Sequence, residues 1–142
     1  MADPDPGEEH DLEARVARAF SRLAEASERA DRLSASGRFV TTEFLTGSFA
    51  RPVHLTLRDG RVTAASEGPR LMRSWRFAFR ATPTAWSEYW RPVPRPGWHD
   101  LLALTKRGEA ALEGDLHPFL ANLQFFKDLL ALPRGRCSGA QR

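Results

Sequence analysis

The chain has 142 residues, of which 42% are hydrophobic, so it can form one compact domain with a single core but is too short for two full domains. No apolar run approaches the roughly 18 residues that a membrane-spanning helix needs, and the acidic start, Met1 to Asp11, lacks the basic and apolar regions of a signal peptide. We therefore expect a cytoplasmic protein. Its single cysteine, Cys137, excludes an internal disulfide and a cysteine-based metal site.

The net charge of +3 is distributed unevenly along the chain. Residues 1–31 contain nine acids and four arginines (−5), whereas the remainder contains nine acids and seventeen basic residues (+8). Because the arginines are scattered over strands and turns and do not cluster on one helix, we expect no nucleic-acid partner. A transient, salt-sensitive contact with an anionic membrane surface stays open beside a merely solvated surface.

The first predicted element is an amphipathic helix. Residues 1–7 combine acids, prolines and glycine with nothing to bury, so we expect a disordered lead-in. From Glu8 to about Leu33, apolar residues recur every three or four positions and form one stripe beside a charged face. This helix leaves open a homodimer, or a role as a protein interaction module, through its apolar stripe.

The spacing of apolar residues then changes to two, which indicates strands. We expect strands over Phe39 to Leu45 and over Val53 to Ala64, with the second run interrupted by Asp59-Gly60. An Asp-Gly pair between alternating runs predicts a tight hairpin, because both central residues of a type I′ turn need positive φ. The alternation assigns the inner face to Val53, Leu55, Leu57, Val62 and Ala64. A further strand follows, with Trp75, Phe77 and Phe79 on its inner face.

Two short helices and a strand are predicted next. Thr82-Pro83 provides an N-cap and a first-turn proline for a helix that carries Trp86, Tyr89 and Trp90. The proline-rich residues 92–97 predict a loop, followed by a short helix from Trp98 to Lys106 and a strand from Ala110 to Glu113.

The last predicted element is an apolar helix from Leu116 to Leu132 that ends at Pro133. Its apolar residues occupy one broad side: Leu116, Phe119, Leu120, Leu123, Phe126, Leu129 and Leu130. We expect residues 8–133 to form the single domain and residues 134–142 to form a flexible tail.

This order of elements resembles the type-two sterol carrier protein domain over nearly the whole chain after residue 8. The resemblance depends most on LTLRDGRV (Leu55 to Val62), where the family has a strand pair turning at an Asp-Gly step, and on LEGD (Leu112 to Asp115), where it has a Gly-Asp step before the closing helix. The chain departs from better-known members in its long charged N-terminal helix and its proline-rich linker from Arg91 to Gly97.

The resemblance implies an α+β fold with about five mainly antiparallel strands, helices over one face, and an apolar cavity between sheet and helices. It also implies noncovalent binding or carrying of a fatty acid, acyl-coenzyme A, sterol or similar apolar small molecule, without a cofactor.

The candidate ligand-binding residues are large apolar side chains near the predicted cavity. Four aromatics lie in one short stretch and would form the cavity mouth, and four more residues lie on the closing helix. Ordinary core packing is the alternative for all of them. These residues are Trp86, Tyr89, Trp90, Trp98, Phe119, Leu123, Phe126 and Leu130.

The sequence contains no constellation that marks an enzyme, so we assign no catalytic residue and no metal ligand. Acidic and histidine side chains gather only at His99, Asp100, Glu113, Asp115 and His117, where helix caps and first-turn charges explain them. The enzymatic alternative is a small enzyme that acts on a hydrophobic polycyclic or polyketide-like substrate in the same cavity. His99, Asp100 or Tyr89 would then serve as acid or base.

Overall fold

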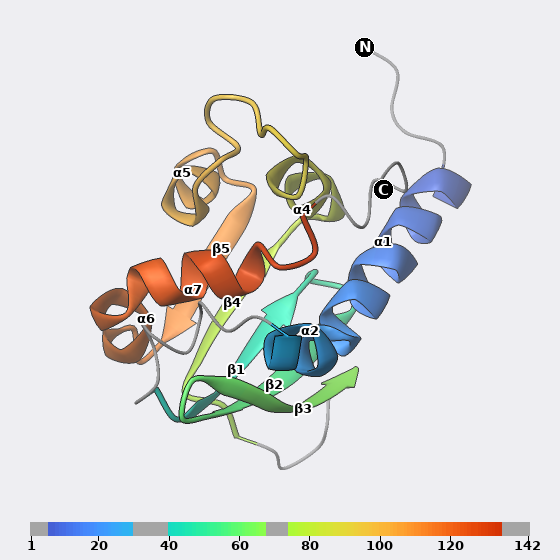
Figure 1. The fold of residues 1–142 in the computed structure, drawn as a ribbon. Coiled ribbons are helices and arrows are strands. Elements are labelled where there is room, and N and C mark those ends of the chain that lie inside the picture. Colours follow the sequence, from blue (N-terminus) through green and yellow to red (C-terminus); the bar gives the residue numbers. More distant parts are fainter. Residues whose placement is uncertain (1–5, 30–39, 68–73, 135–142) are drawn as a thin grey trace.

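The computed structural model describes residues 6–29, 40–67 and 74–134 (Figure 1). The helices are α1 (Pro6–Ser21), α2 (Leu23–Arg29), α4 (Pro83–Tyr89), α5 (Leu101–Lys106), α6 (His117–Ala121) and α7 (Leu123–Leu130). The strands are β1 (Thr42–Gly47), β2 (Pro52–Arg58), β3 (Arg61–Glu67), β4 (Phe77–Ala81) and β5 (Ala110–Gly114). None of the helices in these ranges is long and apolar enough to cross a membrane.

The five strands form one sheet in the order β3-β2-β1-β4-β5. The pair β1 and β4 is parallel, and the other neighbours are antiparallel, which confirms the predicted α+β fold with a mainly antiparallel sheet. The helices lie over the face that carries the buried side chains of Phe44, Leu55 and Phe79 (Figure 1). This face and the helices together enclose the core.

The hairpin at Asp59-Gly60 is confirmed. Asp59 has φ 52° and Gly60 has φ 78°, as a two-residue type I′ turn requires. Two further bonds hold the tip against the segment before β1: Asp59 N–H donates to Thr41 Oγ1 at 3.1 Å, and Gly60 N–H donates to the Val40 carbonyl at 2.9 Å.

The predicted inner face of β3 is wrong beyond Val62. Leu57 pairs with Val62, but Thr56 pairs with Ala64, so Thr63 is an extra residue in a β-bulge. A bulge shifts the alternation by one position. Ala64 is therefore exposed, and Ala65 packs against the core in its place.

Two strand predictions need correction at their starts. Trp75 precedes β4 and is 37% exposed, so it does not lie on the inner face of a strand. The Arg76 N–H bonds to the Glu43 carbonyl while the chain is still entering the sheet. The predicted start of the first strand, Phe39, lies outside the described residues, and β1 begins at Thr42.

The N-terminal helix begins at Pro6, inside the predicted lead-in, and is interrupted at Arg22. Ser21 Oγ donates to the Ala17 carbonyl at 2.9 Å, and a hydroxyl that bonds back by one turn tends to bend a helix. The bend lets both Phe20 and Leu23 reach full burial. Of the predicted apolar stripe, Val16, Phe20 and Leu23 are buried within their own chain, whereas Leu12 is partly exposed. The predicted end of the helix, Leu33, lies outside the described residues, and the homodimer stays a prediction.

The helix with the three predicted aromatics starts as expected. Thr82 Oγ1 accepts a hydrogen bond from Ala85 N–H at 3.1 Å, and Pro83 occupies the first turn of α4. The next helix, α5, begins at Leu101, later than predicted, because Asp100 is in an extended conformation at the N-cap position. Its carboxylate makes no cap hydrogen bond. The strand β5 confirms the prediction from Ala110.

The closing helix is two helices, α6 and α7, separated at Asn122. The Asn122 side-chain amide donates to the Pro118 carbonyl at 3.0 Å, and this local bond competes with a continuous helical ladder. The break rotates the two apolar faces, so Leu120 is 50% exposed and Phe125 is buried, contrary to the predicted single stripe.

Packed structure continues past the predicted end of the domain. The Arg134 guanidinium donates two hydrogen bonds to the Tyr89 carbonyl, at 3.0 and 2.9 Å, and lies 5.0 Å from the centre of the Tyr89 ring. Residue 134 therefore belongs to the folded domain. Residues 135–142 of the predicted tail lie outside the described residues.

Replacing Gly60 by Val should lower the free energy of unfolding by about 1 kcal/mol or more, because a β-branched residue tolerates positive φ poorly. Urea denaturation measures this change. The matched control is Arg61→Val, at the exposed first position of β3, which should change stability far less. Equal effects from both substitutions would contradict the tight turn.

A second pair of variants tests the glycine of the LEGD motif. Gly108 and Gly114 both have positive φ, but a Cβ at Gly114 would lie 2.6 Å from the Arg76 carbonyl oxygen, whereas a Cβ at Gly108 would meet nothing within 4 Å. Gly114→Ala should therefore destabilise the protein more than Gly108→Ala, by about 1–3 kcal/mol of overpacking. Thermal and urea unfolding of the two variants would refute this if their stabilities were the same.

Candidate functional site

Most of the predicted ligand-binding residues lie in one packed aromatic cluster. Trp86, Tyr89, Trp90, Phe119, Phe126 and Leu130 are each at most 3% exposed. Trp86 stacks on Trp90 with ring centres 5.4 Å apart, and Phe20 of α1 contacts both rings at 4.8 and 5.3 Å. Ring contacts continue from Trp86 through Phe79, Phe119 and Phe126 to Phe44 on the central strand β1.

Three polar atoms of the α4 aromatics fix that helix in place. Trp86 Nε1–H donates to the Gly47 carbonyl at 2.9 Å, and Trp90 Nε1–H donates to the Leu130 carbonyl at 2.7 Å. Tyr89 O–H donates to the Lys127 carbonyl at 2.7 Å, and burial raises the pKa of Tyr89 well above its ordinary value. The phenol therefore keeps its proton, which is already committed to a backbone carbonyl.

The other two predicted ligand residues lie at the edge of this core. Leu123 is partly buried at the start of α7. Trp98 packs against the core from the loop before α5, with the Arg107 guanidinium 4.2 Å and that of Arg95 5.7 Å from its ring centre. The structure thus separates Trp98 from the ring stack of α4.

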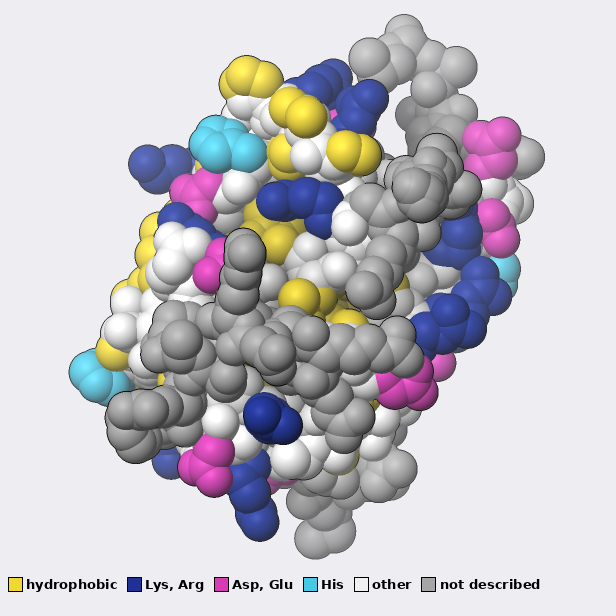
Figure 2. Space-filling view, viewed as in Figure 1, with side chains coloured by type: hydrophobic (Ala, Val, Ile, Leu, Met, Phe, Trp, Pro, Cys, Tyr) yellow, Lys and Arg dark blue, Asp and Glu magenta, His cyan; other side chains and the backbone are white. Residues whose placement is uncertain are grey.

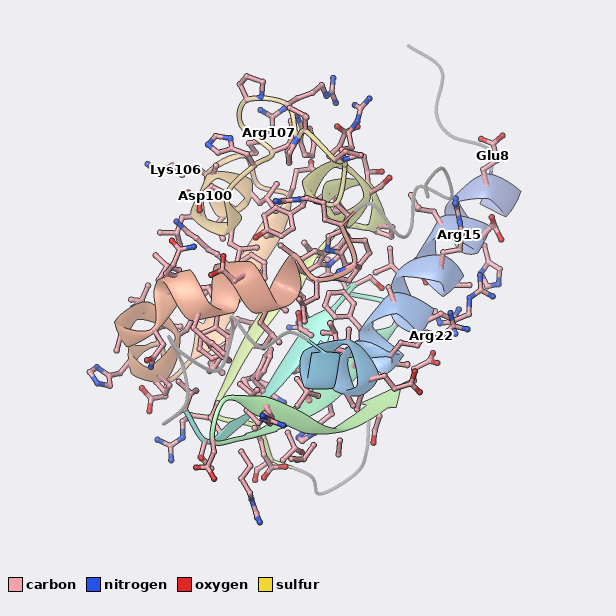
Figure 3. All side chains as sticks on the ribbon, viewed as in Figure 1. Glu8, Arg15, Arg22, Asp100, Lys106 and Arg107 are labelled. Atoms are coloured by element: carbon pink, nitrogen blue, oxygen red, sulfur yellow. The ribbon has the colours of Figure 1, made fainter. Side chains whose placement is uncertain are left out.

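A groove of about 370 Å³ lies between α1 and α4, and it is the candidate site. Val16 and Trp90 are 2% and 3% exposed and form its floor. The rim consists of the partly exposed or exposed side chains of Leu12, Arg15, Ser87, Glu88 and Arg91. Arg15 projects from α1 in Figure 3. The groove therefore combines an apolar floor with charged groups at its edge.

The charges at the rim are organised around Glu88. Its Oε1 accepts from Arg91 at 3.1 Å and from Arg95 at 2.9 Å. Burial acts to raise the pKa of Glu88, but the two arginines outweigh it and hold the pKa below its ordinary value. Across the groove, Arg15 pairs with Asp11 at 3.4 Å, where both side chains are at least half exposed, so this pair contributes little.

Sequence reasoning missed the α1 wall of the groove. Leu12 and Val16 belong to the predicted apolar stripe. Periodicity indicates that such a stripe packs against another part of the protein, but it does not identify that part. The contact of α1 with α4 joins residues about 70 positions apart in the chain. Of the predicted ligand-binding residues, Trp90 lines this groove.

A second hollow, of about 440 Å³, lies on the other face of the sheet. It is bordered mainly by polar side chains of β1 and β2 and by Trp75. Near it, His54 is 4% exposed, with Nε2 at 3.2 Å from the Ser74 carbonyl and 3.5 Å from Glu43 Oε1. These contacts attach the residues before β4 to the sheet.

The candidate acid–base groups are occupied by other partners. Asp100 Oδ1 lies 2.9 Å from Lys127 Nζ, an ion pair without hydrogen-bond alignment. Glu113 pairs with Arg80, and Asp115 with Arg76 at 3.5 Å. Asp115 also accepts from the His117 N–H at 3.2 Å, but Leu116 occupies the N-cap position of α6 and no side chain caps that helix, so the predicted cap is wrong. Over the described ranges, no three His, Cys, Asp or Glu side chains could hold a metal ion.

Comparison with known proteins identifies the fold. No protein-family model matches the chain, and no curated protein is a match at significance. Among solved structures, the crystal structure of sterol carrier protein 2 is similar with a TM-score of 0.58 and 15% identity, over 87% of this chain and 94% of that one. The solution structure of a Thermus thermophilus protein, described as possibly a sterol carrier protein, is similar with a TM-score of 0.50 and 16% identity. That match covers 80% of this chain and 83% of the other. The chain therefore has the fold of sterol carrier protein 2.

Proposed function

We propose that this protein binds an amphipathic lipid-like molecule noncovalently, with its apolar part on the groove between α1 and α4. The observation that carries the proposal is the groove itself, in which Leu12 is partly exposed beside the buried side chains of Val16 and Trp90, and Arg15 and Arg91 lie at the rim. Such a pairing of apolar floor and peripheral cations suits a molecule with an acyl or ring portion and one acidic group.

The size of the groove supports a small ligand or one portion of a larger ligand. Its volume of about 370 Å³ is at the lower end of the usual range for small-molecule sites, about 300–1,000 Å³. Affinity would come from burial of apolar surface, at about 25 cal/mol per Å². A ligand that penetrates further would have to displace Trp90, whose indole is bonded to the Leu130 carbonyl.

The likeness to sterol carrier protein 2 supports a carrier in preference to a catalyst. That protein's name describes it as a carrier of sterol, and this chain shares its fold. The proposal includes no covalent step, since Tyr89 holds its proton on the Lys127 carbonyl and Asp100 faces Lys127 Nζ. A fatty acid fits the rim arginines better than a neutral sterol does, because its carboxylate can pair with them.

Calorimetric titration with lauric acid tests the proposal. Ser87 is an exposed groove residue on α4, and Thr84 is exposed on the same helix outside the groove. Ser87→Phe should weaken lauric acid binding by about tenfold or more, because the phenyl ring would fill part of the groove. A tenfold change corresponds to about 1.4 kcal/mol of binding free energy. Thr84→Phe, the matched control, should bind as the unmodified protein does.

The melting temperatures of both variants are measured beside the affinities, so that unfolding is not mistaken for a filled site. Unmodified protein that binds no lauric acid would contradict the proposal outright. Equal affinities of the Ser87 and Thr84 variants would move the ligand away from this groove.

A further inference from the structure

The loop between α4 and α5 projects an apolar tip. It spans residues 91–100 and lies at the top of Figure 1, beside the ends of both helices. Val93 is 83% exposed, the highest value among the large hydrophobic residues that the structure describes. It stands between Pro92 and Pro94, with Arg95 and Pro96 following, so the tip presents hydrocarbon next to one exposed cation. We call residues 92–96 the proline tip.

Basic side chains surround the proline tip. Arg91 and Arg95 lie within the loop, and Lys106 and Arg107 lie at the end of α5; all four residues are exposed. Figure 3 shows Arg107 beside this loop and Lys106 at α5, and Figure 2 shows hydrophobic and basic side chains together at the top of the molecule. The nearby acidic side chains already form ion pairs, Glu88 with two arginines and Asp100 with Lys127. The surface is therefore positive.

Trp98 packs against the core of the domain and so anchors the loop. The Arg107 guanidinium lies 4.2 Å from its ring centre. Gly97 lies directly beside the same guanidinium and has φ 86°, a backbone conformation that favours glycine. A partly buried tryptophan beside arginines is the composition that proteins place at the boundary between lipid headgroups and acyl chains.

The backbone of the loop is also suited to a water-poor environment. The prolines at 92, 94 and 96 have no N–H group, so these positions have no donor to desolvate. The N–H groups of Arg91, Gly97 and Trp98 already donate to Glu88 O, His99 Nδ1 and Arg95 O. When an irregular loop enters a membrane interface, its backbone N–H groups lose the water to which they were bonded. This loop has few such N–H groups.

We propose that the proline tip and its surrounding cations form a contact site for an anionic phospholipid membrane. Val93 and the prolines enter the headgroup region, and Arg91, Arg95, Lys106 and Arg107 pair with lipid phosphates. A nucleic acid would use the cations but leave Val93 exposed to water. Because Arg91 and Glu88 also border the groove between α1 and α4, the same contact brings the groove's rim to the membrane surface.

Co-sedimentation with vesicles of phosphatidylcholine, with or without phosphatidylglycerol, tests this site without any groove ligand. The protein should bind the mixed vesicles, and added salt should weaken that binding. Arg95→Gln and Lys106→Gln should each reduce partitioning by about fivefold. Val93→Asp should reduce it at least as much while leaving the melting temperature unchanged, since the side chain is exposed. Binding should also shift the fluorescence of unmodified protein but not that of Trp98→Phe.

Matched controls distinguish this loop from the remaining surface. Leu120→Asp changes another exposed apolar residue, and Arg61→Gln changes another exposed cation, so neither should affect vesicle binding. Absence of binding to the mixed vesicles, or equal losses in the controls, would overturn the proposal. Salt-sensitive vesicle binding that Val93→Asp does not change would also overturn the proposal, because the apolar tip would then play no part in the contact. The lauric acid titration is independent, so either proposal can fail alone.

Discussion

The placement of α4 is the constraint on which the rest of the structure depends. Two indole N–H groups and one phenol O–H of this helix enter the core, and a buried donor without a partner costs about 1–3 kcal/mol. Each meets a backbone carbonyl, at Gly47, Lys127 and Leu130. These bonds attach α4 at once to the sheet and to α7. Large rings supply the apolar burial, and their polar atoms specify one orientation in which that burial occurs.

The consequences of this placement extend to both proposed sites. Because Trp90 is held inward against Leu130, it forms part of the floor of the groove between α1 and α4. At its other side, α4 ends at the proline tip, so the groove and the positive loop share Glu88 and Arg91. The proposed ligand groove and the proposed membrane contact site are thus both built around one short helix and the loop that follows it.

The predicted residues and the observed groove differ for a physical reason. A stretch rich in tryptophan offers the same residue types to a cavity wall and to a packed core, and composition does not distinguish the two. In the structure, ring-against-ring contacts from Phe20 through Trp86 to Phe126 fill the centre. The groove is instead lined partly by α1, through Leu12 and Val16 of its apolar stripe and Arg15 of its charged face.

The sequence by itself determined the structural features that depend only on residues next to one another in the chain. Asp59-Gly60 set the hairpin because its turn needs positive φ at both positions, and Thr82-Pro83 set the start of α4 because a cap acts within one turn. Tertiary structure decided what depends on distant partners: the bulge at Thr63, the break at Asn122 and the exposure of Trp75. It also decided that α1 packs against α4. Periodicity states that a face is buried, but the partner that buries it is fixed only when the whole chain packs.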